Sequence, residues 1–307
     1  MGEVLRALLL GVVQGLTEFI PVSSSGHLVL VPHFLGIETP GIAFDVALHL
    51  GTFAAVVLYF RTDIVHLITA VFGIGDPVYV SYYRRLAFLL VLGSVPIAVV
   101  GLALRDVFEA AFDSPTAAAG FLLVTGTLLL VGEAARSRRG GVTAQAGSSD
   151  TRGARGELDE LDDEQVLLGH DPNDPSGLTL DAIGPRQAMA IGFGQCIALF
   201  PGISRSGTTI VAGMTAGLTR PAATRFSFLL ALPALVGATI VSVPDLADGT
   251  AGFGPLALSV GIVAAFVSGY LAIRWLLALV ARHRLTWFAI YCLVLGTLSL
   301  VALTLGA

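Results

Sequence analysis

The sequence predicts an all-α integral membrane protein made of two inverted repeats, each a re-entrant helix pair followed by three transmembrane helices. Of its 307 residues, 55% are hydrophobic and only 13% are charged, whereas about a quarter of the residues in soluble domains are charged. The apolar runs are long and are bounded by charged residues or by Gly, Pro and Asp clusters. Stretches in the two halves of the chain also resemble each other, which indicates a duplication.

Five apolar segments precede a long polar stretch, and five follow it. The segments of the first half lie near residues 4–20, 24–36, 42–60, 84–104 and 116–134. The segments of the second half lie near residues 186–200, 205–217, 223–243, 255–280 and 285–305. The last three segments of each half have about 19 residues or more, which is enough to cross a hydrocarbon core of roughly 30 Å. The first two segments of each half are too short or too interrupted to cross it comfortably.

Proline interrupts the short segments in both halves. Pro21 and Pro201 are each followed by serine and glycine, which predicts a helix that enters the membrane, turns and goes back. Each half then has three full crossings. Because this number is odd, we expect the second half to lie upside down relative to the first.

Two pairs of stretches support the repeat. QGLTEFIPVSSSG at residues 14–26 has the same length as QCIALFPGISRSG at residues 195–207, and both place Phe and Pro before a serine cluster and Gly. RLAFLLVLGSVP from Arg85 resembles RFSFLLALPALV from Arg225. Two similarities in the same order indicate an internal duplication.

The chain divides into a first membrane repeat at 1–135, an acidic linker at 136–184 and a second membrane repeat at 185–307. The linker contains GELDELDDEQ, and we expect it to be disordered or loosely helical. All 17 residues counted as Lys or Arg are arginine. An acidic surface poor in lysine suits a high-salt cytoplasm, although genomic base composition would also favour arginine over lysine.

The distribution of arginine predicts the topology. The arginines in loops on the side opposite the N-terminus are Arg61, Arg84, Arg85, Arg136, Arg138, Arg139, Arg220, Arg225, Arg282 and Arg284. The N-terminal side shows mainly Arg6 and Arg105 beside several acidic residues. Since arginine-rich loops stay in the cytoplasm, we expect a multi-pass protein of the cell membrane with both termini outside and the 136–184 linker in the cytoplasm.

Polar residues gather at the two proline breaks. A charged side chain at membrane depth costs roughly 3 kcal/mol or more unless it has a partner or a polar cavity. Gln14 and Glu18 are four residues apart and therefore share one helix face, and Ser24 and His27 lie on the first turn after the first break. Arg205 lies immediately after the second break. These residues are therefore expected to form a functional site.

Such a site suits phosphate chemistry. Helix N-termini, a guanidinium and several hydroxyls make an anion pocket. A serine hydroxyl, an imidazole and a carboxylate add a nucleophile, a proton carrier and a metal or proton site, which indicates phosphoryl transfer. The alternative is a polyprenyl-phosphate flippase or an anion transporter, because many secondary transporters are inverted repeats with broken helices. Ser24 and His27, together with Arg205, distinguish the two, since a carrier needs no catalytic geometry.

Two segments, QGLTEFIPVSSSGH and PGISRSGTT, closely resemble the signature motifs of the BacA/UppP family of undecaprenyl-diphosphate phosphatases. The family motifs are Glu/Gln-x-x-x-Glu and Pro-Gly-x-Ser-Arg-Ser-x-x-Thr. The resemblance covers both halves of the membrane domain and leaves out only the linker. It implies a hydrolase that converts undecaprenyl or another polyprenyl diphosphate to the monophosphate and phosphate, recycling the lipid carrier of cell-envelope glycan assembly. Mg²⁺ or Ca²⁺ would assist. In an archaeal cell the substrate could be a dolichol-type diphosphate.

The resemblance also implies a role for each residue. Glu18 would be the essential carboxylate and the metal ligand, Ser24 the nucleophile and His27 the proton shuttle, with direct attack by His27 as the alternative. Arg205 would bind the diphosphate. The other substrate-binding candidates are Ser204, Ser206, Thr209, Gln14, Ser23 and Ser25. Gln14 stands where many members have a first glutamate, which puts metal binding through two carboxylates in question.

The remaining polar and aromatic residues are interpreted as structural. The residues expected to serve in packing or at an interface are His49, His66, Cys196 and Cys292. Trp275 and Trp287 resemble interfacial anchors, and Arg274 could extend to the cytoplasmic surface. The expected partners are a polyprenyl diphosphate lipid and the membrane, with a homodimer as a possible assembly. We expect no nucleic acid, because the sequence has no basic patch suited to it.

Overall fold

The structure is a computed structural model that describes residues 2–37, 42–104, 107, 108, 111, 114–144, 169, 171, 174, 177–241 and 253–306. Within these residues the secondary structure is helical apart from one isolated bridge between Leu178 and Leu218. The elements of the first half are α1 (Glu3–Phe19), α2 (Ser24–Leu35), α3 (Ile42–Tyr59), α4 (Arg61–Val71), α5 (Pro77–Ala103) and α7 (Pro115–Ala144). η2 (Leu180–Ala182) lies in the linker, and the elements of the second half are α9 (Pro185–Ile197), α10 (Arg205–Thr215), α11 (Arg220–Val241), α13 (Pro255–Arg282) and α14 (Thr286–Thr304).

Several of these helices are long and apolar enough to cross a membrane. Five of the described helices meet this criterion, namely α5, α7, α11, α13 and α14. A sixth span is formed if α3 and α4, which bend by 76° at their junction, are counted together. The protein is therefore an all-α integral membrane protein, as predicted, and the predicted crossing at 42–60 corresponds to α3, the first helix of the bent pair.

α4 lies outside the ten predicted segments. Its sequence RTDIVHLITAV is less apolar than the crossings, which is why the hydropathy of the sequence does not reveal it. Helical structure here is supported by packing on α5 and by an ion pair to α11. The two Asp63 carboxylate oxygens each lie 2.8 Å from Arg225 Nη2, and the Arg225 guanidinium lies 5.3 Å from the centroid of the Phe60 ring.

α7 continues through Ala144, beyond the predicted start of the linker. Residues 145–168 of that linker lie outside the described residues. Near its end the linker is tied back to α7, because Arg136 donates to Asp171 at 2.7 Å and to Asp174 at 3.2 Å. Where the structure describes the linker, its first residues extend α7 and residues near its end contact α7.

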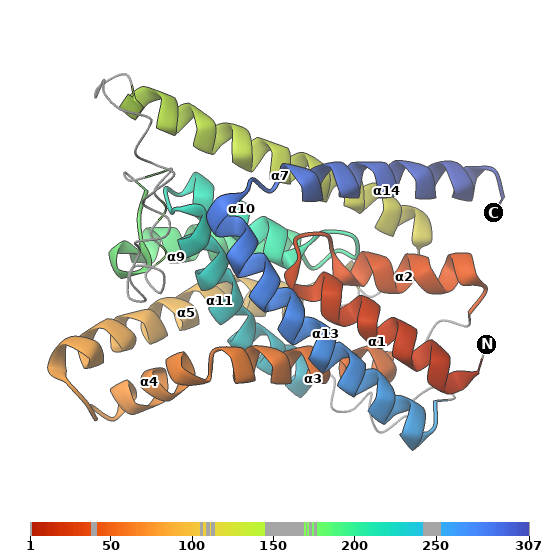
Figure 1. Ribbon diagram of the computed structural model, residues 1–307, viewed down its shortest axis with the longest axis horizontal. Helices are drawn as coiled ribbons and strands as arrows, with labels where there is room; N and C mark the ends of the chain where they lie inside the picture. Colours follow the sequence, from red (N-terminus) through yellow and green to blue (C-terminus); the bar gives the residue numbers. More distant parts are fainter. Residues whose placement is uncertain are drawn as a thin grey trace.

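Each half begins with two short helices joined at a proline break. Figure 1 shows α2 doubling back beside α1; that the pair is re-entrant in a membrane stays a prediction. A serine caps the second helix of both pairs. The Ser23 hydroxyl accepts a hydrogen bond from Gly26 N at 3.3 Å, and the Ser204 hydroxyl accepts one from Gly207 N at 3.0 Å. The two breaks therefore share a local cap as well as a sequence pattern.

The two halves pack through equivalent helices. α1 lies along α13, and α9 lies along α5, so the first helix of each half packs on a long helix of the other half. α7 and α14 run antiparallel along one edge of the molecule (Figure 1). Gly126 of α7 faces Leu293 of α14, and Gly296 of α14 faces Leu123 of α7. The same offset in sequence relates both pairs, as expected of helices related by a two-fold axis; how the halves lie relative to a membrane stays a prediction.

Buried aromatic rings hold the end of α1. Phe19 packs edge to face on Phe228 with ring centroids 5.5 Å apart, and Phe60 packs on the same ring at 6.4 Å. All three side chains are almost fully buried. This cluster fixes the C-terminal turn of α1, which carries Glu18.

Candidate active site

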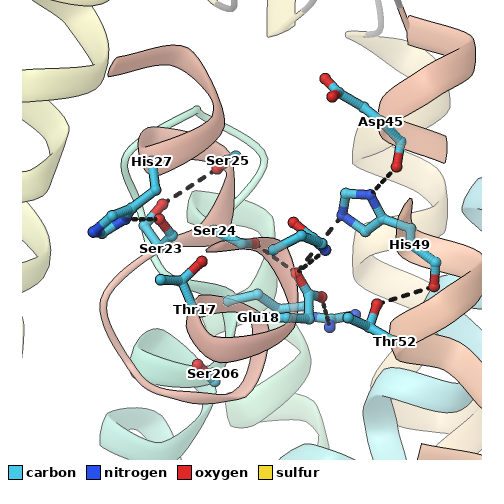
Figure 2. Close-up of polar contacts among 12 residues, drawn as sticks. Thr17, Glu18, Ser23, Ser24, Ser25, His27, Asp45, His49, Thr52 and Ser206 are labelled. Carbon is cyan, nitrogen blue, oxygen red and sulfur yellow. Dashed lines mark hydrogen bonds and ion pairs between the residues drawn. The ribbon is translucent and has the colours of Figure 1, made fainter. Parts of the chain in front are cut away.

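Glu18 is the centre of a polar cluster between the two breaks (Figure 2). Its Oε1 accepts a hydrogen bond from Arg205 Nη2 at 2.5 Å, and its Oε2 accepts one from the Ser24 hydroxyl at 2.5 Å. Gln14 Nε2 also donates to Oε2, at 3.0 Å. The Glu18 side chain is only 6% exposed. Charge-assisted hydrogen bonds of this kind are the strong ones, so the carboxylate is stabilised by three donors despite its burial.

Two of the three donors to Glu18 come from equivalent positions in the predicted repeat. Ser24 is the first residue of α2, and Arg205 is the first residue of α10, which is the equivalent position in the second half. The breaks also contact each other directly, because Gly202 N donates to the Ser25 hydroxyl at 3.4 Å. Two helix N-termini therefore meet beside Glu18. Their partial positive charges favour an anion at this place.

His27 points away from Glu18 (Figure 2). Its Nδ1 lies 2.7 Å from the Ser23 carbonyl oxygen, and its Nε2 lies 2.7 Å from the Tyr291 hydroxyl of α14. A carbonyl oxygen can only accept, so Nδ1 carries the hydrogen and Nε2 of the neutral ring accepts from Tyr291. Both ring nitrogens therefore have partners other than Ser24.

This arrangement differs from the expected pairing of Ser24 with His27. Residues three apart on a helix differ in direction by about 60°. Ser24 points to the Glu18 carboxylate, whereas His27 points to α14. The structure thus offers Glu18, and not His27, as the hydrogen-bond acceptor for the Ser24 hydroxyl.

The other predicted hydroxyl residues of the second break are brought to the site but bond to the protein. Ser204 Oγ, which caps α10, lies 3.1 Å from Ser206 Oγ. The Thr209 hydroxyl donates to the Arg205 carbonyl oxygen at 2.7 Å and lies 2.5 Å from Ser227 Oγ. All three predicted residues are buried. Their described contacts hold the first turn of α10 and so fix the direction of Arg205.

His49 also lies beside the site, although we expect a packing residue from the sequence. Its Nε2 is 3.7 Å from Glu18 Oε2, and its side chain is 33% exposed. Its Nδ1 lies 2.8 Å from the Asp45 carbonyl oxygen, which orients the ring (Figure 2). The sequence does mark His49 as a candidate site residue, because it is an ionisable side chain within an apolar segment, as Glu18 is.

The chain matches the family model described as Bacitracin resistance protein BacA over residues 7–298. It is similar along almost its whole length to proteins named undecaprenyl-diphosphatase. The relative from Syntrophotalea carbinolica is 41% identical over 293 residues, which cover 95% of this chain and 96% of the relative. The relative from Mycolicibacterium paratuberculosis is 38% identical over 323 residues, which cover 98% and 97%.

A relative from a methanogen shows the same similarity. The undecaprenyl-diphosphatase of Methanobrevibacter smithii is 36% identical over 304 residues, which cover 96% of this chain and 95% of the relative. Both breaks and every residue that contacts Glu18 lie within the matched range of the family model. The chain therefore belongs to the bacitracin resistance protein BacA family.

Proposed function

We propose that the protein is an undecaprenyl-diphosphatase, a membrane phosphatase that hydrolyses undecaprenyl or a related polyprenyl diphosphate to the monophosphate and phosphate. The reaction would recycle the lipid carrier of cell-envelope glycan assembly. The observation that carries the proposal is the meeting of Ser24 and Arg205 at the buried Glu18 carboxylate. The names and full-length similarity of the relatives support it. The match to the BacA family model does not favour the alternative function, a flippase or an anion transporter.

The geometry supports Ser24 as nucleophile and Glu18 as its base. The Ser24 hydroxyl already donates to Glu18 Oε2, so the carboxylate can take the proton as Ser24 Oγ attacks the terminal phosphorus. The new Oγ–P bond forms while the bridging P–O bond breaks, and the polyprenyl monophosphate leaves. Water then attacks the phosphoserine, Ser24 regains a proton and phosphate departs. Direct attack by His27 would require its ring to leave at least one of its two partners.

Arg205 would bind the diphosphate while it holds Glu18. A guanidinium has five N–H donors, and the hydrogen bond to Glu18 uses Nη2. The Arg205 side chain is 20% exposed, so it can reach both the buried carboxylate and a ligand outside it. Phosphate charge would also be stabilised by the N-termini of α2 and α10.

Mg²⁺ or Ca²⁺ remains part of the proposal, with Glu18 and Gln14 as the residues that would hold it. Gln14 is fully buried, and its Oε1 has no hydrogen-bond partner. A free amide oxygen beside a carboxylate is a donor set that both cations bind. The described residues contain no group of three or more His, Cys, Asp or Glu side chains suited to a metal, so substrate phosphates would complete the coordination. The cation would supply charge neutralisation on the phosphate oxygens.

We further propose that both termini lie outside and that the 136–184 linker is cytoplasmic. Contacts made by two of the arginines predicted to lie on the inner side support this location. Arg85 of α5 donates to the Asp181 carbonyl oxygen at 2.5 Å, and Arg220 of α11 pairs with Glu133 of α7. The first contact joins α5 to the linker and the second joins the two halves, at the side to which the positive-inside rule assigns the cytoplasm. A homodimer stays a prediction.

The proposed function is tested by phosphate release from a C55 polyprenyl diphosphate by the purified protein in detergent with Mg²⁺ or Ca²⁺. The wild-type chain should release one phosphate per molecule of substrate and leave the polyprenyl monophosphate. Movement of a labelled polyprenyl phosphate across vesicle membranes without any hydrolysis would contradict the proposal and favour the flippase.

A further inference from the structure

The turn that precedes Ser24 has an unusual backbone. Ser23 has φ 69° and ψ 97°, and it is the only non-glycine residue with a positive φ among those that the structure describes. A residue with a Cβ is strained in this region and keeps the conformation only where its surroundings hold it. Because Ser23 directly precedes Ser24, its conformation sets the direction in which the Ser24 hydroxyl points.

His27 is the residue that holds Ser23. Its backbone N–H donates to the Ser23 carbonyl oxygen at 3.3 Å, and its ring Nδ1–H donates to the same oxygen at 2.7 Å. The ring therefore adds a second and shorter hydrogen bond to the ordinary helical one. Loss of the ring's orientation would leave the carbonyl of the strained residue with only the longer backbone hydrogen bond.

Tyr291 in turn holds the His27 ring. The Tyr291 hydroxyl lies 2.7 Å from His27 Nε2, and the two rings are parallel within 2° with centroids 5.7 Å apart. Tyr291 belongs to α14, at the far end of the sequence, and the residue is 46% exposed. A hydrogen bond at the edge of the molecule thus connects a long helix of the second half to the turn of the first break.

The equivalent helix of the first half lacks this hydroxyl. FLLVTGTLLLV from Phe121 aligns with YCLVLGTLSLV from Tyr291, and the reciprocal contacts of α7 and α14 have the same register. The Phe121 ring lies 5.0 Å from Phe200, next to the second break. That break carries Arg205 where the first break carries Ser24. The tyrosine hydroxyl therefore occurs in α14, next to the break that carries Ser24, and not at the equivalent position of α7.

We propose that Tyr291 is a positioning residue for the hydrolysis, which through His27 holds the strained Ser23 and keeps the Ser24 hydroxyl directed at Glu18. The inference rests on the proposed function. It gives His27 the role of an orienting group and not of a proton carrier. Among the described residues, the Tyr291 hydroxyl bonds to His27 and not to Ser24 or Glu18. Removal of this hydroxyl should therefore lower kcat more than it changes KM.

The first test is the variant Tyr291→Phe, which removes the hydroxyl and keeps the ring. We expect kcat to fall about tenfold with KM changed less than about twofold, as for the loss of one well-placed hydrogen bond. Tyr270→Phe is the matched control, because it removes a hydroxyl from α13, where the ring packs on Tyr59 at 5.9 Å. Its kinetics should equal those of the wild type. Equal kcat values in Tyr291→Phe and the wild type would overturn the proposal.

A double-variant cycle identifies the route of the effect. If Tyr291 acts through His27, then adding Tyr291→Phe to His27→Ala should cause no further loss of kcat. A further tenfold loss would show that Tyr291 acts by another route and would contradict the inference.

Hydrogen exchange without substrate separates this inference from the proposed function. Amides of the peptide covering residues 20–28 should exchange faster in Tyr291→Phe than in the wild type, with no such change in Tyr270→Phe. If the wild type releases no phosphate, the proposed function fails and the exchange result alone decides whether Tyr291 holds the turn. Unchanged exchange in this peptide would refute the positioning role in either case.

Discussion

The Arg205 guanidinium and the Glu18 carboxylate join the two proline breaks through a contact of 2.5 Å. One residue comes from each half of the chain, and both lie at the ends of short helices. Because Glu18 also accepts a hydrogen bond from the Ser24 hydroxyl, one carboxylate holds both Arg205, the proposed phosphate-binding residue, and Ser24, the proposed nucleophile. The first prediction follows from its geometry.

Arg205→Lys should lower kcat/KM by roughly 10- to 100-fold although the charge is kept. A point ammonium cannot hold the carboxylate and a phosphate with the planar fork of a guanidinium. Steady-state phosphate release measures the effect, and Arg274→Lys on the exposed face of α13 is the control. Unchanged kinetics in Arg205→Lys would remove this residue from the site.

Gln14→Glu should lower the Mg²⁺ concentration needed for half-maximal activity by about tenfold, because it places a second carboxylate one helical turn from Glu18. Titration of activity with Mg²⁺ provides the measurement. Gln195→Glu is the matched control, since Leu199 occupies the position equivalent to Glu18 in the second half. The same Mg²⁺ dependence in the wild type and Gln14→Glu would argue against a cation at these residues.

Glu133→Gln should destabilise the fold by about 3–5 kcal/mol, because it leaves the charge of the buried Arg220 without its partner. In the wild type, Arg220 Nε and Nη2 each lie 3.0 Å from a different oxygen of Glu133. Thermal unfolding in detergent measures the loss. Joint replacement by Glu133→Leu and Arg220→Met should cost less than Glu133→Gln, because no buried charge is left unpaired. Equal stability of Glu133→Gln and the wild type would contradict this account of the ion pair.

Impermeant maleimide should label Gly306→Cys but not Ser149→Cys in intact cells, if the C-terminus is outside and the linker is cytoplasmic. Both variants are made in a chain whose Cys196 and Cys292 are replaced by serine. Labelling of Ser149→Cys should appear only after the cells are permeabilised. Labelling in the opposite order would reverse the predicted topology.

Much of the fold could be predicted because hydropathy and proline positions are local properties of the sequence. The apolar crossings and the two short helix pairs lie near their predicted positions. α4 could not be predicted in the same way, since its stability depends on packing against α5 and on the ion pair between Asp63 and Arg225. The extension of α7 and the docking of Arg136 on Asp171 likewise depend on tertiary contacts.

The site could be predicted where residues are neighbours in sequence or occupy equivalent positions in the repeat. Glu18, Ser24 and Arg205 meet for this reason. The direction of His27 could not be predicted from the sequence, because one of the two partners of its ring is Tyr291, 264 positions away. His49 lies on α3 and Glu18 on α1, so the spacing of the two residues in the sequence does not predict their contact.

The central claim is that Ser24, paired with Glu18, attacks the diphosphate. Its most direct test is to quench the reaction during turnover and locate the phosphorylated residue by peptide mass spectrometry, with phosphate release measured for Ser24→Ala. We predict phosphoserine at Ser24 and a loss of at least about 1,000-fold in kcat, or about 4 kcal/mol of transition-state stabilisation. Thr17→Ala, which removes a hydroxyl that donates to the Val13 carbonyl oxygen, should stay near wild type. Near wild-type turnover in Ser24→Ala, with phosphohistidine found at His27, would contradict the claim.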